Sequence, residues 1–288
     1  MQARLLHSLG IAMCLFLLAC TAAPPTPSAA QYFTDAKNNL AASDFDAALK
    51  NLERSIKAAG GQPVGQQASV LRTVLVTALA EGSKQMAETY GAGLKQPAAQ
   101  MRFGHFTKMR ADYYGIARAR LMDAMQGVMD QRGKLNDKPM PVEVTFPGFT
   151  STEDPALTRI KNGYAVEDAD RYRAELKSDR NALARTLAAV VGAGDDPNKG
   201  QDIFSKGKVE IDPRVYLLEL SSTFLRLGGI FERRALDEPR YFRAVNEVVR
   251  DNMDLALKLL ATKPDKDLEA RAKKMRADCV KTLKTLGS

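Results

Sequence analysis

The chain has 288 residues, of which 45% are hydrophobic and 26% are charged, which is ordinary for a globular protein of one large or two small domains. Its formal net charge of +8 permits contact with anionic lipid headgroups but does not require nucleic acid. It has no Trp, no zinc-ligand spacing and no alternation of aromatic residues with Arg, so we expect no nucleic-acid partner. Helix-favouring residues dominate the composition.

The first residues have the pattern of a secretory signal. Arg4 gives a short positive start, an uncharged apolar stretch runs from Leu9 to Leu18, and the small residue Ala19 precedes Cys20. The apolar stretch is too short to span a bilayer, which needs about 20 residues. A positive start, a short apolar core and a small residue before the cut are typical of a signal peptide.

The segment Leu17-Leu18-Ala19-Cys20 resembles the lipobox of bacterial lipoproteins. The resemblance implies cleavage between Ala19 and Cys20, with lipid attached to the sulfur and the new amino group of Cys20. Thr21 follows, where inner-membrane lipoproteins of Gram-negative bacteria have Asp. The resemblance therefore points to a lipid anchor at the periplasmic face of the outer membrane, in the bacterial cell envelope.

An ordinary secretion signal cut near Ala22 or Ala23 is the alternative, and it gives Cys20 no role. In either case the small, proline-rich stretch TAAPPTPSAA cannot build a core and behaves as an extended spacer. We expect residues 1–19 to be the signal peptide, 20–30 a tether, and 31–288 one helical domain.

Residues 30–59 have the apolar periodicity of two short helices separated by Ser43 and Asp44. This pair resembles one tetratricopeptide repeat, with departures where Ser43, Ser55 and Gly60 replace the family's Gly, Ala and Pro. No clean copies follow at a 34-residue period. The residues that match the repeat are Tyr32, Ala36, Phe45, Ala48 and Leu52.

Apolar stripes predict helices through most of the remaining chain. We expect an all-α fold, an irregular array of antiparallel helical hairpins. In the stripe that begins at Tyr172, this aromatic residue is expected to face inward. The predicted helices cover about 70–79, 86–94, 106–128, 168–191, 213–231, 239–263 and 268–286.

Two segments interrupt this pattern. Residues 134–155 contain four prolines, which forbid a continuous helix and predict a long loop in which VEVTF forms a short strand. Residues 192–202, GAGDDPNKGQD, predict a polar turn.

The sequence offers little catalytic or metal-binding chemistry. His105 is the one histidine after Cys20, and we expect it to be partly buried with a structural or capping role. Asp196, Asn198 and Asp202 are spaced like calcium ligands but lack the rest of a calcium loop. We expect no metal and no cofactor.

Two further features are expected to be structural. Cys279 lies on an apolar helical stripe and predicts a small buried side chain rather than a reactive thiol. The pair Gly228-Gly229 predicts a close approach of a neighbouring helix or a ligand, with helix packing the favoured interpretation. A large residue at position 229 is expected to disrupt packing.

Three functions are compatible with these features. The first is a lipid-anchored scaffold or adaptor that binds envelope proteins in a groove between stacked helices. The second is a carrier for a small apolar ligand, with a pocket among the methionines Met101, Met109, Met122, Met125 and Met129. The third is an enzyme, which we do not expect. Its catalytic residues would be His105 or a pair of carboxylates, such as Glu167 with Asp168 or Glu143 with Glu153.

Overall fold

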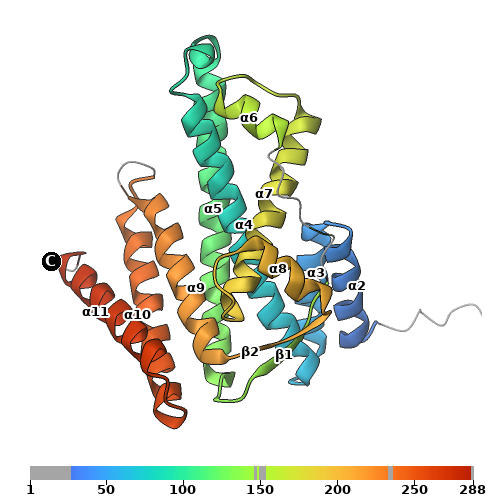
Figure 1. Ribbon diagram of the computed structural model, residues 1–288, viewed down its shortest axis with the longest axis vertical. Coiled ribbons are helices and arrows are strands. Elements are labelled where there is room, and N and C mark those ends of the chain that lie inside the picture. Colours follow the sequence, from blue (N-terminus) through green and yellow to red (C-terminus); the bar gives the residue numbers. More distant parts are fainter. Residues whose placement is uncertain (1–26, 146–147, 149–153, 233–235, 287–288) are drawn as a thin grey trace, which may run out of the picture.

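In a computed structural model of the protein, the residues described are 27–145, 148, 154–232 and 236–286. Within them the chain is almost entirely helical, with one two-stranded sheet (Figure 1), which confirms the predicted all-α fold. The α-helices are α2 (Ala29–Ala41), α3 (Phe45–Ala58), α4 (Pro63–Gly93), α5 (Phe103–Gln131), α6 (Pro155–Lys161), α7 (Asp168–Val190), α8 (Pro197–Ser205), α9 (Pro213–Gly228), α10 (Pro239–Thr262) and α11 (Lys266–Leu286). The 3₁₀ turns are η1 (Pro97–Arg102), η2 (Arg132–Lys134) and η3 (Gly229–Phe231).

The first two helices form the expected antiparallel hairpin. Ser28 caps α2 by accepting a hydrogen bond from the Gln31 amide, and the Ser55 hydroxyl donates to the Ala29 carbonyl at 2.8 Å across the hairpin. Of the residues matched to the repeat, Tyr32 is only half-buried, whereas its neighbour Phe33 is buried. Phe33 lies three residues before Ala36 and seven before Leu40. These two residues are buried, so Phe33 shares their face of α2.

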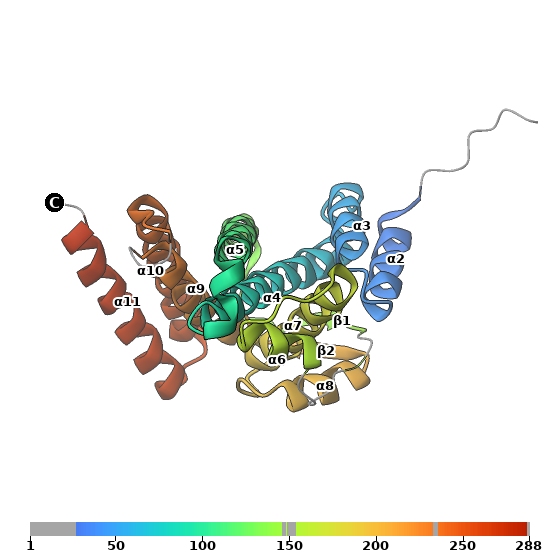
Figure 2. The same cartoon turned by 90° about the horizontal axis from the view of Figure 1, so that it is seen from above.

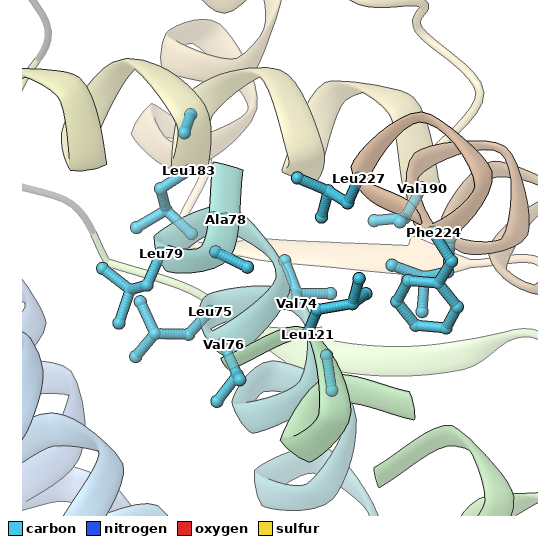
Figure 3. Close-up of a cluster of buried hydrophobic side chains, with 14 of the residues drawn as sticks. Val74, Leu75, Val76, Ala78, Leu79, Leu121, Leu183, Val190, Phe224 and Leu227 are labelled. Carbon is cyan, nitrogen blue, oxygen red and sulfur yellow. The ribbon is translucent and has the colours of Figure 1, made fainter. Parts of the chain in front are cut away.

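Helix α4 is the centre of the molecule. Every residue from Thr73 to Ser83 is buried, and α3, α5, α7 and α9 all pack against this helix. Figure 3 shows side chains of α5, α7 and α9 converging on those of α4. Each large apolar side chain buried here contributes about 1.5–3 kcal/mol to stability.

The two helices predicted at 70–79 and 86–94 are one helix, α4. The apolar stripe stops after Leu79 because polar Glu81 and Ser83 follow, yet both are buried. Glu81 accepts two hydrogen bonds from the Arg226 guanidinium of α9, and Arg185 of α7 lies 3.8 Å away. Polar residues inside this helix therefore bind neighbouring helices instead of ending it.

The predicted proline-rich loop contains strand β1 (Met140–Glu143), which confirms a strand at this place but with earlier bounds. It pairs antiparallel with β2 (Lys208–Ile211), which we did not predict, and Met140 lies opposite Ile211. The polar turn predicted at 192–202 is wrong in its second half, where α8 begins at Pro197 with Asp196 as its cap.

Helices α9, α10 and α11 form the other end of the molecule (Figure 1). Gly228, not Gly229, allows the close approach, because a Cβ at 228 would lie 3.1 Å from Val245 of α10 while position 229 has room. Cys279 is 1% exposed, as predicted, and burial raises the pKa of its thiol to about 11. Tyr172, expected inside, is 60% exposed.

Among the described residues, no helix is long and apolar enough to cross a membrane.

Substitution of Gly200 by Ala should destabilise the fold. A Cβ at this position would lie 1.9 Å from the Ala184 carbonyl oxygen and 2.9 Å from its Cα, so α8 must move away from α7. We expect a loss of about 1–3 kcal/mol in the free energy of unfolding, measured by urea denaturation. The control Gly115→Ala on α5 has nothing within 4 Å of the added Cβ and should gain about 0.5–1 kcal/mol. Equal effects of the two substitutions would contradict this packing.

Candidate functional site

A groove runs between α3 and α5, with α4 as its floor. Both helices lie on the same side of α4, whereas α6, α7 and α8 lie on the other (Figure 2). Two hollows, of about 490 and 230 Å³, fill the space between them and share Ile56, Ser69 and Lys134. We call this continuous depression the α3–α5 groove. Its remaining lining residues include Glu53, Lys57, Gln62, Gln66, Val70, Arg72, Thr73, Asp123, Gln126, Gly127, Asp130, Gln131 and Leu135.

Arg72 links the two walls of the groove. From the floor on α4, its guanidinium donates to Glu53 of α3 at 2.8 Å and to both carboxylate oxygens of Asp123 of α5 at 2.9 Å. Burial lowers the pKa of Arg72, but the hydrogen bonds and charges of the two carboxylates outweigh it, so the pKa is raised. The Glu53 and Asp123 side chains remain nearly half exposed and can accept further hydrogen bonds.

A buried polar network lies along the floor of the groove, where its two hollows meet. The Gln131 amide nitrogen lies 2.8 Å from the Thr73 hydroxyl and 2.9 Å from the Ser69 hydroxyl, and the Tyr216 hydroxyl donates to the Gln131 amide oxygen at 2.7 Å. Gln131 thereby joins α4, α5 and α9. Because every member has a partner, the network holds this part of the groove in one geometry.

The groove wall on α5 depends on a small residue. A Cβ at Gly127 would lie 2.6 Å from the Thr73 hydroxyl, so glycine lets α5 lie close to the floor there. The groove as a whole mixes apolar, amide and charged groups of both signs. This chemistry suits a partner surface with apolar and charged side chains better than a purely apolar molecule.

A second titratable cluster lies where α7 crosses α4. Burial raises the pKa of the Asp179 carboxyl to about 7; Glu175 and Asp46 act in the same direction, while the positive charge of Arg120 opposes them. Arg120 reaches from α5 to donate to the Leu79 carbonyl at 3.1 Å.

The structure corrects the role expected for His105. Its side chain is exposed at the start of α5, with its ring 6.3 Å from that of Tyr90 and 5.8 Å from that of Phe106. Among the residues that the structure describes, no carboxylate or thiol forms a hydrogen bond or an ion pair with the His105 side chain.

The other candidate residues that the structure describes have local structural roles. Asp196 caps α8 by accepting from the Asn198 amide, and Glu143 pairs with Lys37. Asp168 binds Arg171 at the start of α7. Within the part of the chain that the structure covers, no three His, Cys, Asp or Glu side chains are placed to hold a metal ion. Ala19, Cys20 and Glu153 lie outside the described residues.

Sequence reasoning missed the residues that define the groove. One signal was present, because Arg72 is a lone cation in the apolar run SVLRTVLV and a buried charge requires partners. The partners themselves, Glu53 and Asp123, have no sequence signal, since they come from two other helices.

Comparisons of the chain with known protein families, with curated proteins and with solved structures find no match.

Replacement of Asp179 by Asn should change how stability depends on pH. A carboxyl whose pKa is raised on folding destabilises the folded state only when it is ionised. The destabilisation by Asp179 is therefore absent below the unfolded pKa of about 3.9. It grows as the pH rises and is complete above about 7. Urea denaturation at pH 4 to 8 should therefore show Asp179→Asn more stable than the parent at pH 8, with the difference shrinking toward pH 4. Asp112→Asn, at an exposed position on α5, is the control. A difference that is constant over this range would contradict the burial of an ionisable Asp179.

Proposed function

We propose that the protein is a lipid-anchored scaffold or adaptor of the bacterial cell envelope, which binds a segment of a partner protein in the α3–α5 groove. The observation that carries this proposal is the groove with Glu53, Arg72 and Asp123 fixed across its floor. Both carboxylates remain nearly half exposed and can accept further hydrogen bonds, and the apolar side chain of Ile56 lines the same hollow.

The groove favours a protein segment over a small apolar ligand. About half of the residues lining the more enclosed hollow are polar, among them Gln62, Gln66 and Ser69. The methionines that suggested a carrier do not share one environment, since Met101 is 98% exposed whereas Met125 is 3% exposed. A carrier for a small apolar ligand is therefore the weaker proposal.

The proposed lipid anchor on Cys20 would hold this groove in the cell envelope. The proposed lipid on Cys20 precedes α2 by nine residues, and an extended, proline-rich spacer rises about 3 Å per residue. Such a tether lets the helical domain stand clear of the membrane while the groove stays open to a partner.

A photo-crosslinking amino acid at position 126 should capture the partner. Gln126 is exposed and lines the groove, whereas Lys274 is exposed on α11, at the other end of the molecule. In the source cells, p-benzoylphenylalanine at 126 should give a discrete protein adduct that the same group at 274 does not give. Arg72→Ala in the 126 background should reduce the yield, because it releases Glu53 and Asp123 from their fixed positions. Identical adducts from both positions, or none from 126, would refute the groove as the binding site.

Substitution of Cys20 by Ser should release the protein from membranes and leave the helical domain folded. Two or three acyl chains hold a protein firmly because each buried methylene contributes about 0.8 kcal/mol. Fractionation of source cells should find the parent in the membrane pellet and the variant in the soluble fraction, while circular dichroism shows unchanged helix content. Lys274→Gln, at an exposed position on α11 that leaves Cys20 in place, is the control. A variant that pellets as fully as the parent would rule out the lipid anchor.

A further inference from the structure

The turn between α4 and α5 projects from one end of the molecule and carries exposed apolar side chains. It lies at the top of Figure 1, far from α2 and from α11. Met101 is 98% exposed and Phe103 59% exposed, and Tyr164, in the turn after α6, is 57% exposed. We call residues 95–108 together with 159–164 the hairpin tip.

A rigid support holds the hairpin tip. Phe106 is fully buried, with its ring 5.3 Å from that of Tyr90. Gly93 allows Phe106 and the Ile160 carbonyl to approach α4, and Gly163 packs against the backbone of Ala99. Because the turn after α6 is packed against η1, the exposed side chains are presented by a fixed structure.

The hairpin tip is strongly basic. Between Thr89 and Ala111 the sequence has no Asp or Glu, and neither does the segment 159–164. Helix α5 has no side-chain cap and no acidic residue in its first turn, so no carboxylate there offsets the cations. The exposed cations of the tip are Lys95, Arg102, Lys108, Arg159 and Lys161.

Among the described residues, four of the five exposed cations of the tip form no ion pair with a carboxylate. Glu88 pairs with Lys84 outside the tip, and Asp168 pairs with Arg171. Asp112 pairs with Lys108, which is the one cation of the tip for which the described residues show an ion pair. The other four basic side chains are thus available to anions.

We propose that the hairpin tip is a membrane-contact site that binds the surface of an anionic lipid bilayer. Met101 and Phe103 enter the interface between headgroups and acyl chains, and the surrounding Lys and Arg side chains bind lipid phosphates. The shape favours a lipid surface over an acidic protein. Met101 is 98% exposed at the end of a hairpin and stands beside cations, and a bilayer offers both an apolar layer and anionic headgroups to such a surface.

This proposal is independent of the α3–α5 groove and of the anchor on Cys20, because it uses different residues. It would give the protein a contact with lipid that does not depend on acylation.

Vesicle binding by the full chain tests the proposal, with Cys20→Ser in every variant so that no acyl chain is attached. Sedimentation with phosphatidylcholine vesicles containing 30% phosphatidylglycerol should pellet the protein far better than phosphatidylcholine alone. Each basic residue near an anionic surface contributes about fivefold to binding. Lys95→Gln with Arg102→Gln should therefore weaken binding by at least about tenfold, whereas Lys274→Gln with Lys281→Gln, on the exposed face of α11, should have a smaller effect.

Fluorescence tests insertion directly. The chain has no Trp, so Phe103→Trp provides a unique reporter, and its emission should shift to shorter wavelength on the anionic vesicles. Met275→Trp on α11 should show no shift. Equal binding to both kinds of vesicle, or an unshifted Trp emission at position 103, would overturn the proposal. Binding of poly-glutamate without binding of vesicles would assign the hairpin tip to an acidic protein partner. That result would also overturn the proposal.

Discussion

The structure depends on the burial of α4 on every side. A helix of 31 residues with an unbroken buried stretch from Thr73 to Ser83 has no solvent face there, so other helices must cover it completely. Helices α3, α5, α7 and α9 do so, and α10 and α11 then pack outside α9. The irregular arrangement of the hairpins follows from this requirement, because they surround a central helix rather than stacking in one direction.

The same requirement creates the α3–α5 groove. Because α3 and α5 pack on the same side of α4, part of α4 lies between them. The residue at that place, Arg72, is charged and largely buried. Arg72 sits in an otherwise apolar part of α4 and is held by Glu53 and Asp123. On the opposite side of the helix, Glu81 meets Arg226 of α9. Each charged residue of this buried helix has an ionic partner, which is the condition for placing it there.

The hairpin formed by α4 and α5 separates two surfaces with different chemistry. The groove, near the start of α4, mixes both signs of charge with amides and a few apolar groups. The tip, at the far end of the same two helices, is basic and apolar. A long hairpin allows one rigid element to carry both surfaces, so the proposed partner site and the proposed lipid site lie well apart (Figure 1).

Local signals in the sequence predicted most of the helices, although they missed α6 and α8 and divided α4 in two. The prolines at the starts of α9 and α10, the capping residue Asp212 and the stop at Pro264 act within one or two turns, so they are visible without knowledge of the fold. The buried position of Cys279 was likewise predicted from the apolar stripe of a single helix. The prediction failed where a residue's environment depends on a distant element. Gly228 rather than Gly229 meets α10, and Tyr172 faces solvent.

The sequence by itself thus determined the all-α class and most helix positions, because helix propensity, capping and periodicity are local properties. It also gave the lipobox-like segment and the spacer on which the proposed anchor depends. Only the tertiary structure decided that α4 is continuous, that Arg72 joins three helices and that Met101 and Phe103 project from a basic tip. The physical reason is that burial and pairing are set by contacts between residues far apart in the chain, and neither periodicity nor composition specifies which elements will meet.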